Sequence, residues 1–103
     1  HRFNHVNVSR CGRYFVCDSV PGSLYGEDGE LRSAGLVVGN LETGKYRTLV
    51  GESMSSGGGG QHQHPHAYLT ADNRNVIYNA DPWGGPTQVR AARVPDGFLE
   101  SLG

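Results

Sequence analysis

Three of the five histidines in this chain lie within five residues, in the segment Gln61-His62-Gln63-His64-Pro65-His66. Imidazole is the commonest metal ligand in proteins. In an extended chain, residues two apart point to the same side, so His64 and His66 can direct both rings at one point. Gln61 can reach the same point from the glycine-rich loop before them. The pattern predicts a metal site that serves an enzyme.

An internal repeat adds a fourth candidate ligand. Residues 5–16 match residues 66–77 at a constant offset of 61, which pairs His5 with His66. Each copy predicts a strand, a tight turn and a second strand. Gly12 and Asn73 occupy the turn position where positive φ is expected, because these residue types tolerate it best. If the two copies are neighbouring units, His5 and His66 start equivalent strands and are expected to converge.

The remainder of each copy predicts a hairpin with a glycine at its turn. The predicted strands are residues 36–41 and 45–50 in the first copy and 89–94 and 98–102 in the second. The predicted fold is therefore all-β, with two four-stranded antiparallel blades of a larger β-propeller. A small sandwich built from a duplicated unit is the alternative. We assign residues 1–50 to one blade, 51–65 to a glycine-rich loop carrying metal ligands, and 66–103 to the C-terminal blade.

Residues 5–18 and 61–81 resemble the C-terminal blades of the oligogalacturonate lyase family. That family is a seven-bladed propeller that degrades pectin. It binds a divalent cation, typically manganese, through a histidine on one inner strand and Gln-x-x-His-x-His on the next. The matching residues here are His5, Gln61, His64 and His66.

The resemblance implies β-elimination on an anionic uronate oligosaccharide. A base removes the C5 proton and the C4 glycosidic oxygen departs, which leaves an unsaturated sugar. The metal ligands would orient the substrate carboxylate, and the family's base lies in earlier blades, outside this chain. The expected partners are the oligosaccharide and the remaining blades or copies of the chain itself. The resemblance leaves a cytoplasmic or a periplasmic location open.

Composition excludes some other classes of function. The formal charge is −1, from nine basic and ten acidic residues. The chain therefore lacks the excess of positive charge that is typical of nucleic-acid-binding proteins. No apolar run is long enough to span a bilayer. Cys11 and Cys17 form no disulfide framework, and we expect two reduced structural thiols with no sign of activation at Cys11.

Two further interpretations of the same residues stay open. One is a non-catalytic propeller scaffold of the TolB-like or WD type, or a self-assembling propeller fragment, because a propeller fold does not decide function. The other is a fortuitous metal-chelating tract in a linker. The match between His5 and His66 argues against the tract, since a tract needs no partner in another repeat.

Overall fold

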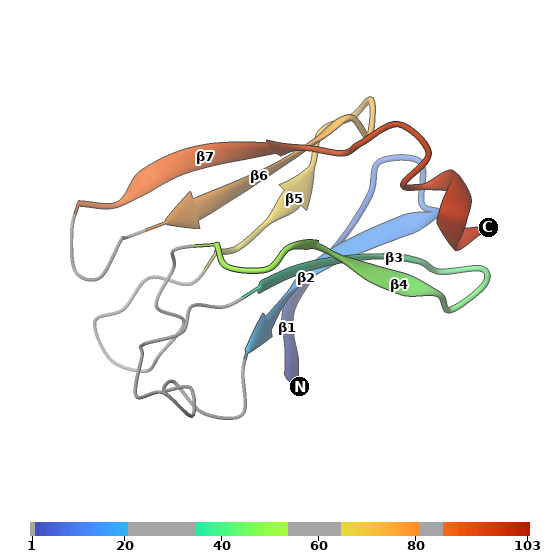
Figure 1. Ribbon diagram of the computed structural model, residues 1–103, viewed down its shortest axis with the longest axis horizontal. Coiled ribbons are helices and arrows are strands. Elements are labelled where there is room, and N and C mark those ends of the chain that lie inside the picture. The colour runs from blue at the N-terminus through green and yellow to red at the C-terminus, as the bar shows by residue number, and fades with distance from the viewer. Residues whose placement is uncertain (1, 21–34, 54–64, 81–85) are drawn as a thin grey trace.

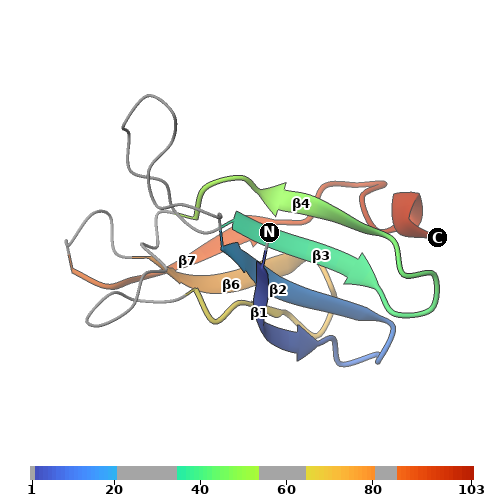
Figure 2. The same cartoon turned by 90° about the horizontal axis from the view of Figure 1, so that it is seen from below.

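The computed structural model describes residues 2–20, 35–53, 65–80 and 86–103, which form two antiparallel sheets. The strands of the first are β1 (Arg2–Val8), β2 (Tyr14–Val20), β3 (Gly35–Asn40) and β4 (Tyr46–Val50). Those of the second are β5 (Tyr68–Leu69), β6 (Asn75–Ala80) and β7 (Gln88–Arg93). The strands of each sheet follow one another in chain order, and the two sheets stack as layers (Figures 1 and 2). The all-β prediction is confirmed, and neither sheet closes on itself.

The internal repeat is visible in the hydrogen bonds of the two tight turns. Ser9 N donates to Tyr14 O at 2.8 Å, and Thr70 N donates to Asn75 O at 2.9 Å. In both turns the hydroxyl of the first residue also accepts a bond from the last residue's backbone N–H. Gly12 and Asn73 have φ values of 78° and 60°, as their positions in the repeat predicted.

The prediction of a fourth strand in the second sheet is wrong. Residues 98–102 instead form a turn that continues into the 3₁₀ helix η2 (Glu100–Leu102). The spacing of the apolar residues explains the difference, because Phe98 and Leu102 are both buried while Glu100 between them is exposed. A strand would place all three side chains on one face, whereas a helical turn separates Glu100 from the other two.

The hydrophobic core lies between the two sheets. The first sheet contributes Val16, Leu36 and Val38, all at 0% exposure, and the second contributes Val76 and Tyr78. The C-terminal segment closes one end of this core with Val94, Phe98 and Leu102. Burial of such side chains stabilises the stacked arrangement by about 1.5–3 kcal/mol each.

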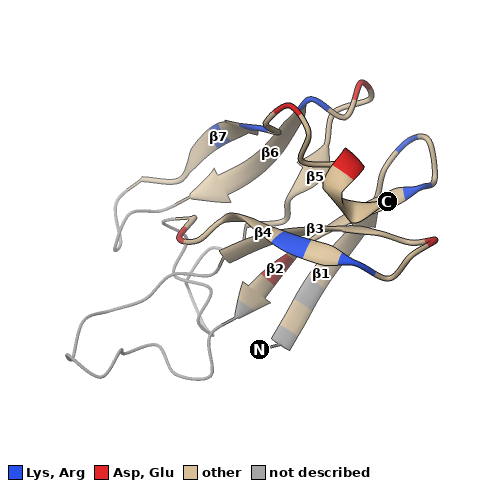
Figure 3. Ribbon diagram, turned by 45° about the vertical axis from the view of Figure 1, so that its right-hand side comes forward, with Lys and Arg blue, Asp and Glu red and all other residues tan. Residues whose placement is uncertain are grey.

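Charged residues of the described part of the chain lie mainly in turns and on the edge strands β4 and β7 (Figure 3). Asp18 is the exception, because it lies in β2 and is 0% exposed. A buried carboxylate is rare unless it is paired. Among the described residues, no helix is both long and apolar enough for a membrane crossing.

Candidate metal centre

The rings of His5 and His66 lie side by side although 61 residues separate them in the chain. Their centroids are 4.2 Å apart and their planes are inclined by 50°. His5 comes from β1 of the first sheet, and His66 lies just before β5 of the second sheet. The prediction that the repeat brings these two histidines together is confirmed.

Both histidines have a backbone conformation that is unusual for their residue type. φ is 51° at His5 and 43° at His66, in the left-handed region that favours glycine. Residues held in sparsely populated backbone regions cost about 1–3 kcal/mol each and cluster at functional sites. The same strained conformation thus occurs at the same position of both repeats.

A β-bulge in β1 accounts for the direction of the His5 side chain. Asn4 pairs with Asp18 and Asn7 pairs with Val16, so β1 has one more residue than β2 in this interval. Two residues of β1, His5 and Val6, therefore lie opposite the single residue Cys17 of β2. A bulge of this kind redirects a side chain that regular alternation would point elsewhere. Here it brings the imidazole of His5 within hydrogen-bond distance of Asp18.

The carboxylate of Asp18 lies within hydrogen-bond distance of Nδ1 of His5 and can accept a bond from a proton on that nitrogen. The Nδ1 atom lies 2.9 Å from Oδ2 and 3.2 Å from Oδ1, and the carboxylate is completely buried. A proton on Nδ1 leaves the lone pair on Nε2, the atom that can then bind a metal. Histidines that bind metals almost always donate their other ring N–H to a carboxylate, a backbone carbonyl or water.

Hydrogen bonds from both sheets hold the segment that carries His66. The Asn7 side chain on β1 donates from Nδ2 to Ala67 O at 2.9 Å. On the other side of His66, the backbone N–H of Asn79 donates to Pro65 O at 2.8 Å. The residues on both sides of His66 are therefore fixed, one of them by the sheet that carries His5.

The other two predicted ligands, Gln61 and His64, lie outside the described residues. Within the described part of the chain, no three His, Cys, Asp or Glu residues group as a metal site. The structure thus brings together two of the four predicted ligands. Their chemistry fits a divalent cation, because two neighbouring imidazoles, one of them backed by a buried carboxylate, form part of a nitrogen donor set.

Sequence reasoning missed Asp18 as a member of this site. A signal was present, since Asp18 interrupts the run Tyr14-Phe15-Val16-Cys17, which predicts a buried strand. An acidic residue in a buried strand is expected to have a partner. The partner itself could not be predicted, because it depends on the bulge.

The expectation that Cys11 shows no activation is wrong. This thiol is exposed, and its pKa is lowered from 9.0 to about 7 by hydrogen bonds, the strongest from the Ser9 hydroxyl. Asn73 Nδ2, from the equivalent turn of the second sheet, lies 3.5 Å from the sulfur. Cys17 behaves as expected of a structural thiol, because burial raises its pKa to about 11. Both cysteines are free.

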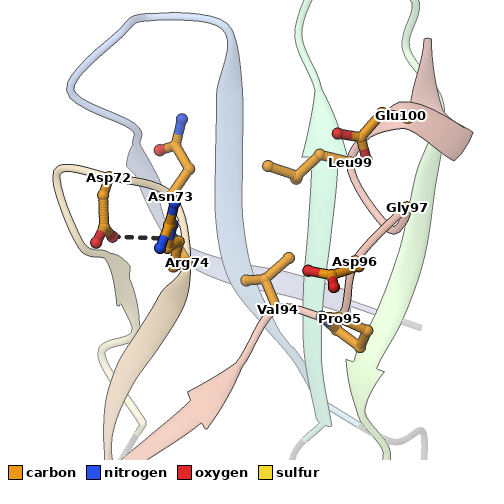
Figure 4. A pocket seen from close by; sticks show the side chains of 9 residues that line it. All are labelled: Asp72, Asn73, Arg74, Val94, Pro95, Asp96, Gly97, Leu99 and Glu100. Carbon is orange, nitrogen blue, oxygen red and sulfur yellow. Dashed lines mark hydrogen bonds between the residues drawn. The ribbon is translucent and has the colours of Figure 1, made fainter.

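His66 precedes β5, and a hollow of about 220 Å³ lies near the opposite end of this strand. It is lined by the turn at residues 72–74 and by residues from 94 to 100 (Figure 4). In the turn, Asp72 Oδ1 accepts a bond of 3.0 Å from the Arg74 backbone N–H. The hollow includes neither histidine, so it is separate from the candidate metal centre.

Comparisons with protein-family models, with curated proteins and with solved structures find no match for this chain.

Proposed function

We propose that the two sheets are neighbouring blades of a β-propeller and that the chain supplies the metal site of a metal-dependent polysaccharide lyase. The observation that carries the proposal is the meeting of His5 and His66. These residues occupy equivalent positions of the two repeats and share an unusual backbone conformation. Neighbouring propeller blades place equivalent inner strands around a common channel.

In this proposal, His5 and His66 bind a divalent cation together with Gln61 and His64. Imidazole and amide donors suit manganese, zinc, nickel or iron, and the resemblance to oligogalacturonate lyases favours manganese. When bound, the cation would supply a Lewis acid next to the carboxylate of a uronate. By holding the cation, these residues would orient the uronate carboxylate so that the C5 proton is exposed to a base.

The proposed reaction is β-elimination on an anionic uronate oligosaccharide. A base outside the residues assigned here takes the C5 proton. The electron pair of the C5–H bond forms the C4–C5 double bond, and the C4–O bond breaks with its electron pair going to the leaving oxygen. The role of this chain in that reaction is therefore to bind and orient the substrate.

Metal binding by the chain tests the proposal. We expect about one Mn²⁺ per chain by elemental analysis of protein prepared without a histidine tag. Replacing His66 with alanine removes one of the converging rings, so we expect His66→Ala to lower Mn²⁺ affinity by at least about 10- to 100-fold, the loss typical when only an outer-shell partner of a ligand is removed. Isothermal titration calorimetry with Mn²⁺ measures this change.

His1→Ala is the matched control, because it removes a histidine that is not part of the four-residue pattern. This variant should bind Mn²⁺ as the unaltered chain does. No metal uptake by the unaltered chain, or equal affinity in the His66→Ala variant, would contradict the proposal. Either result would favour a non-catalytic propeller scaffold. Where metal binding is established, release of unsaturated product from oligogalacturonate, followed by ultraviolet absorbance, tests the substrate class.

A further inference from the structure

We infer that Asp18 is a positioning residue that holds His5 with its proton on Nδ1, so that Nε2 is the atom presented to the metal. This inference rests on the proposed function, since it assigns a role toward the same metal site. The buried carboxylate and the 2.9 Å contact between Oδ2 and Nδ1 carry it.

The burial of Asp18 calls for a specific partner. Its side chain is 0% exposed, and His5 is the one described residue whose side chain bonds to it. Removal of a carboxylate from water is costly unless the charge is paired and hydrogen-bonded. An Nδ1–H of His5 satisfies the carboxylate by a hydrogen bond, and 32% of the His5 side chain is exposed.

The repeat shows that the fold itself does not require an acid at this position. The residue equivalent to Asp18 at the offset of 61 is Asn79, which lies in β6 as Asp18 lies in β2. Asparagine has nearly the same size and lacks the charge. The same strand position therefore accepts an amide in one repeat and carries a carboxylate in the repeat whose histidine it contacts.

A carboxylate behind a ligating imidazole does two things that an amide does less well. It fixes the tautomer and orientation of the ring, and its charge raises the basicity of the nitrogen that faces the metal. Loss of such a partner typically costs about 10- to 100-fold in metal affinity. A purely structural carboxylate would affect the stability of the fold but not the affinity of the folded protein for metal.

The test is Mn²⁺ affinity of the full chain carrying Asp18→Asn, measured by isothermal titration calorimetry. We expect Kd to rise by about 10- to 100-fold, with the variant folded as judged by circular dichroism. Asp72→Asn is the matched control, because it removes the same charge from an exposed turn at the far end of β5. That control should leave Kd unchanged.

A second measurement covers the case in which Asp18→Asn does not fold. Nitrogen-15 chemical shifts of the histidine rings in the unaltered, metal-free chain report which ring nitrogen of His5 carries the proton. A proton on Nδ1 supports the inference, and a proton on Nε2 overturns it. Equal Mn²⁺ affinity in a folded Asp18→Asn variant overturns the inference alone. Absence of Mn²⁺ binding by the unaltered chain overturns the proposed function and this inference with it.

Discussion

Cys11 and Cys17 lie six residues apart, yet their surroundings give them opposite acidities. The pKa is about 7 for Cys11 and about 11 for Cys17. Because the thiolate is the nucleophile, we expect Cys11 to react with iodoacetamide at a rate that rises as pH increases through about 7 and then levels off. Cys17 should stay unmodified in the folded protein over the same pH range. Mass spectrometry of the two peptides after timed alkylation measures both rates.

Ser9→Ala is the informative variant for Cys11, because the Ser9 hydroxyl, 3.3 Å from the sulfur, lowers its pKa most. The rate of Cys11 alkylation at neutral pH should fall in this variant, and its midpoint should move to higher pH. A midpoint that stays near 7 after the substitution would contradict the assigned cause. Modification of both cysteines at equal rates would contradict the difference in burial.

The predictable part of the candidate site is the part encoded by local pattern. His5 and His66 could be paired from the sequence, because several residues after each of them also match at the same offset of 61. Asp18 could not be paired with His5 in the same way, because the register shift between Asn4 and Asn7 decides which side chain faces it. The lowered pKa of Cys11 was also hidden, since Asn73 comes from a turn 62 residues away in the other sheet.

In the first sheet, β2 and β3 depend on one glycine for their close contact. Phe15 and Gly39 are paired across the two strands, and a Cβ at Gly39 would collide with the Phe15 ring. We expect Gly39→Ala to lower the free energy of unfolding by about 1 kcal/mol, at the lower end of overpacking costs, because the ring tip can turn toward solvent. Urea denaturation followed by circular dichroism measures the change.

Gly51→Ala is the control for this prediction, since a Cβ there meets no atom and φ is not in the left-handed region. Its effect on unfolding free energy should stay within about 0.5 kcal/mol. In a Phe15→Ala background the collision is removed, so Gly39→Ala should no longer destabilise. Equal destabilisation with and without the Phe15 ring would show that the cost comes from another contact.

Strands bounded by clear turn residues were predictable, and the last element was not. The predicted strand at residues 36–41 corresponds to β3 (Gly35–Asn40), and Gly44, in the predicted turn after it, has a φ of 75°. Residues 98–102 were predicted as a strand because they follow a glycine-containing turn, although their apolar residues do not alternate. The competing arrangement is more favourable because Phe98 and Leu102 reach the core between the sheets together, and Ser101 N bonds to Gly97 O as a helical turn requires.

Different kinds of contact join the two sheets at the two edges of the first sheet, β1 and β4. At the β1 edge, the Asn7–Ala67 hydrogen bond lies next to the pair of histidines. At the β4 edge, the C-terminal segment reaches back to the first sheet. Thr43 Oγ1 donates to Leu102 O at 2.6 Å, and the guanidinium of Arg47 lies 4.8 Å from the centre of the Phe98 ring. This arrangement predicts that the C-terminal segment contributes to the stability of the whole molecule.

Leu102→Ala tests that prediction. Leu102 is 1% exposed and fills the end of the core, so its truncation removes apolar contacts and leaves a cavity. We expect the free energy of unfolding to fall by about 2–5 kcal/mol, measured by urea denaturation. Val89→Ala is the control, because Val89 is 74% exposed and its truncation should cost no more than about 0.5 kcal/mol. Similar small losses in both variants would mean that the C-terminal segment is not part of the cooperative core.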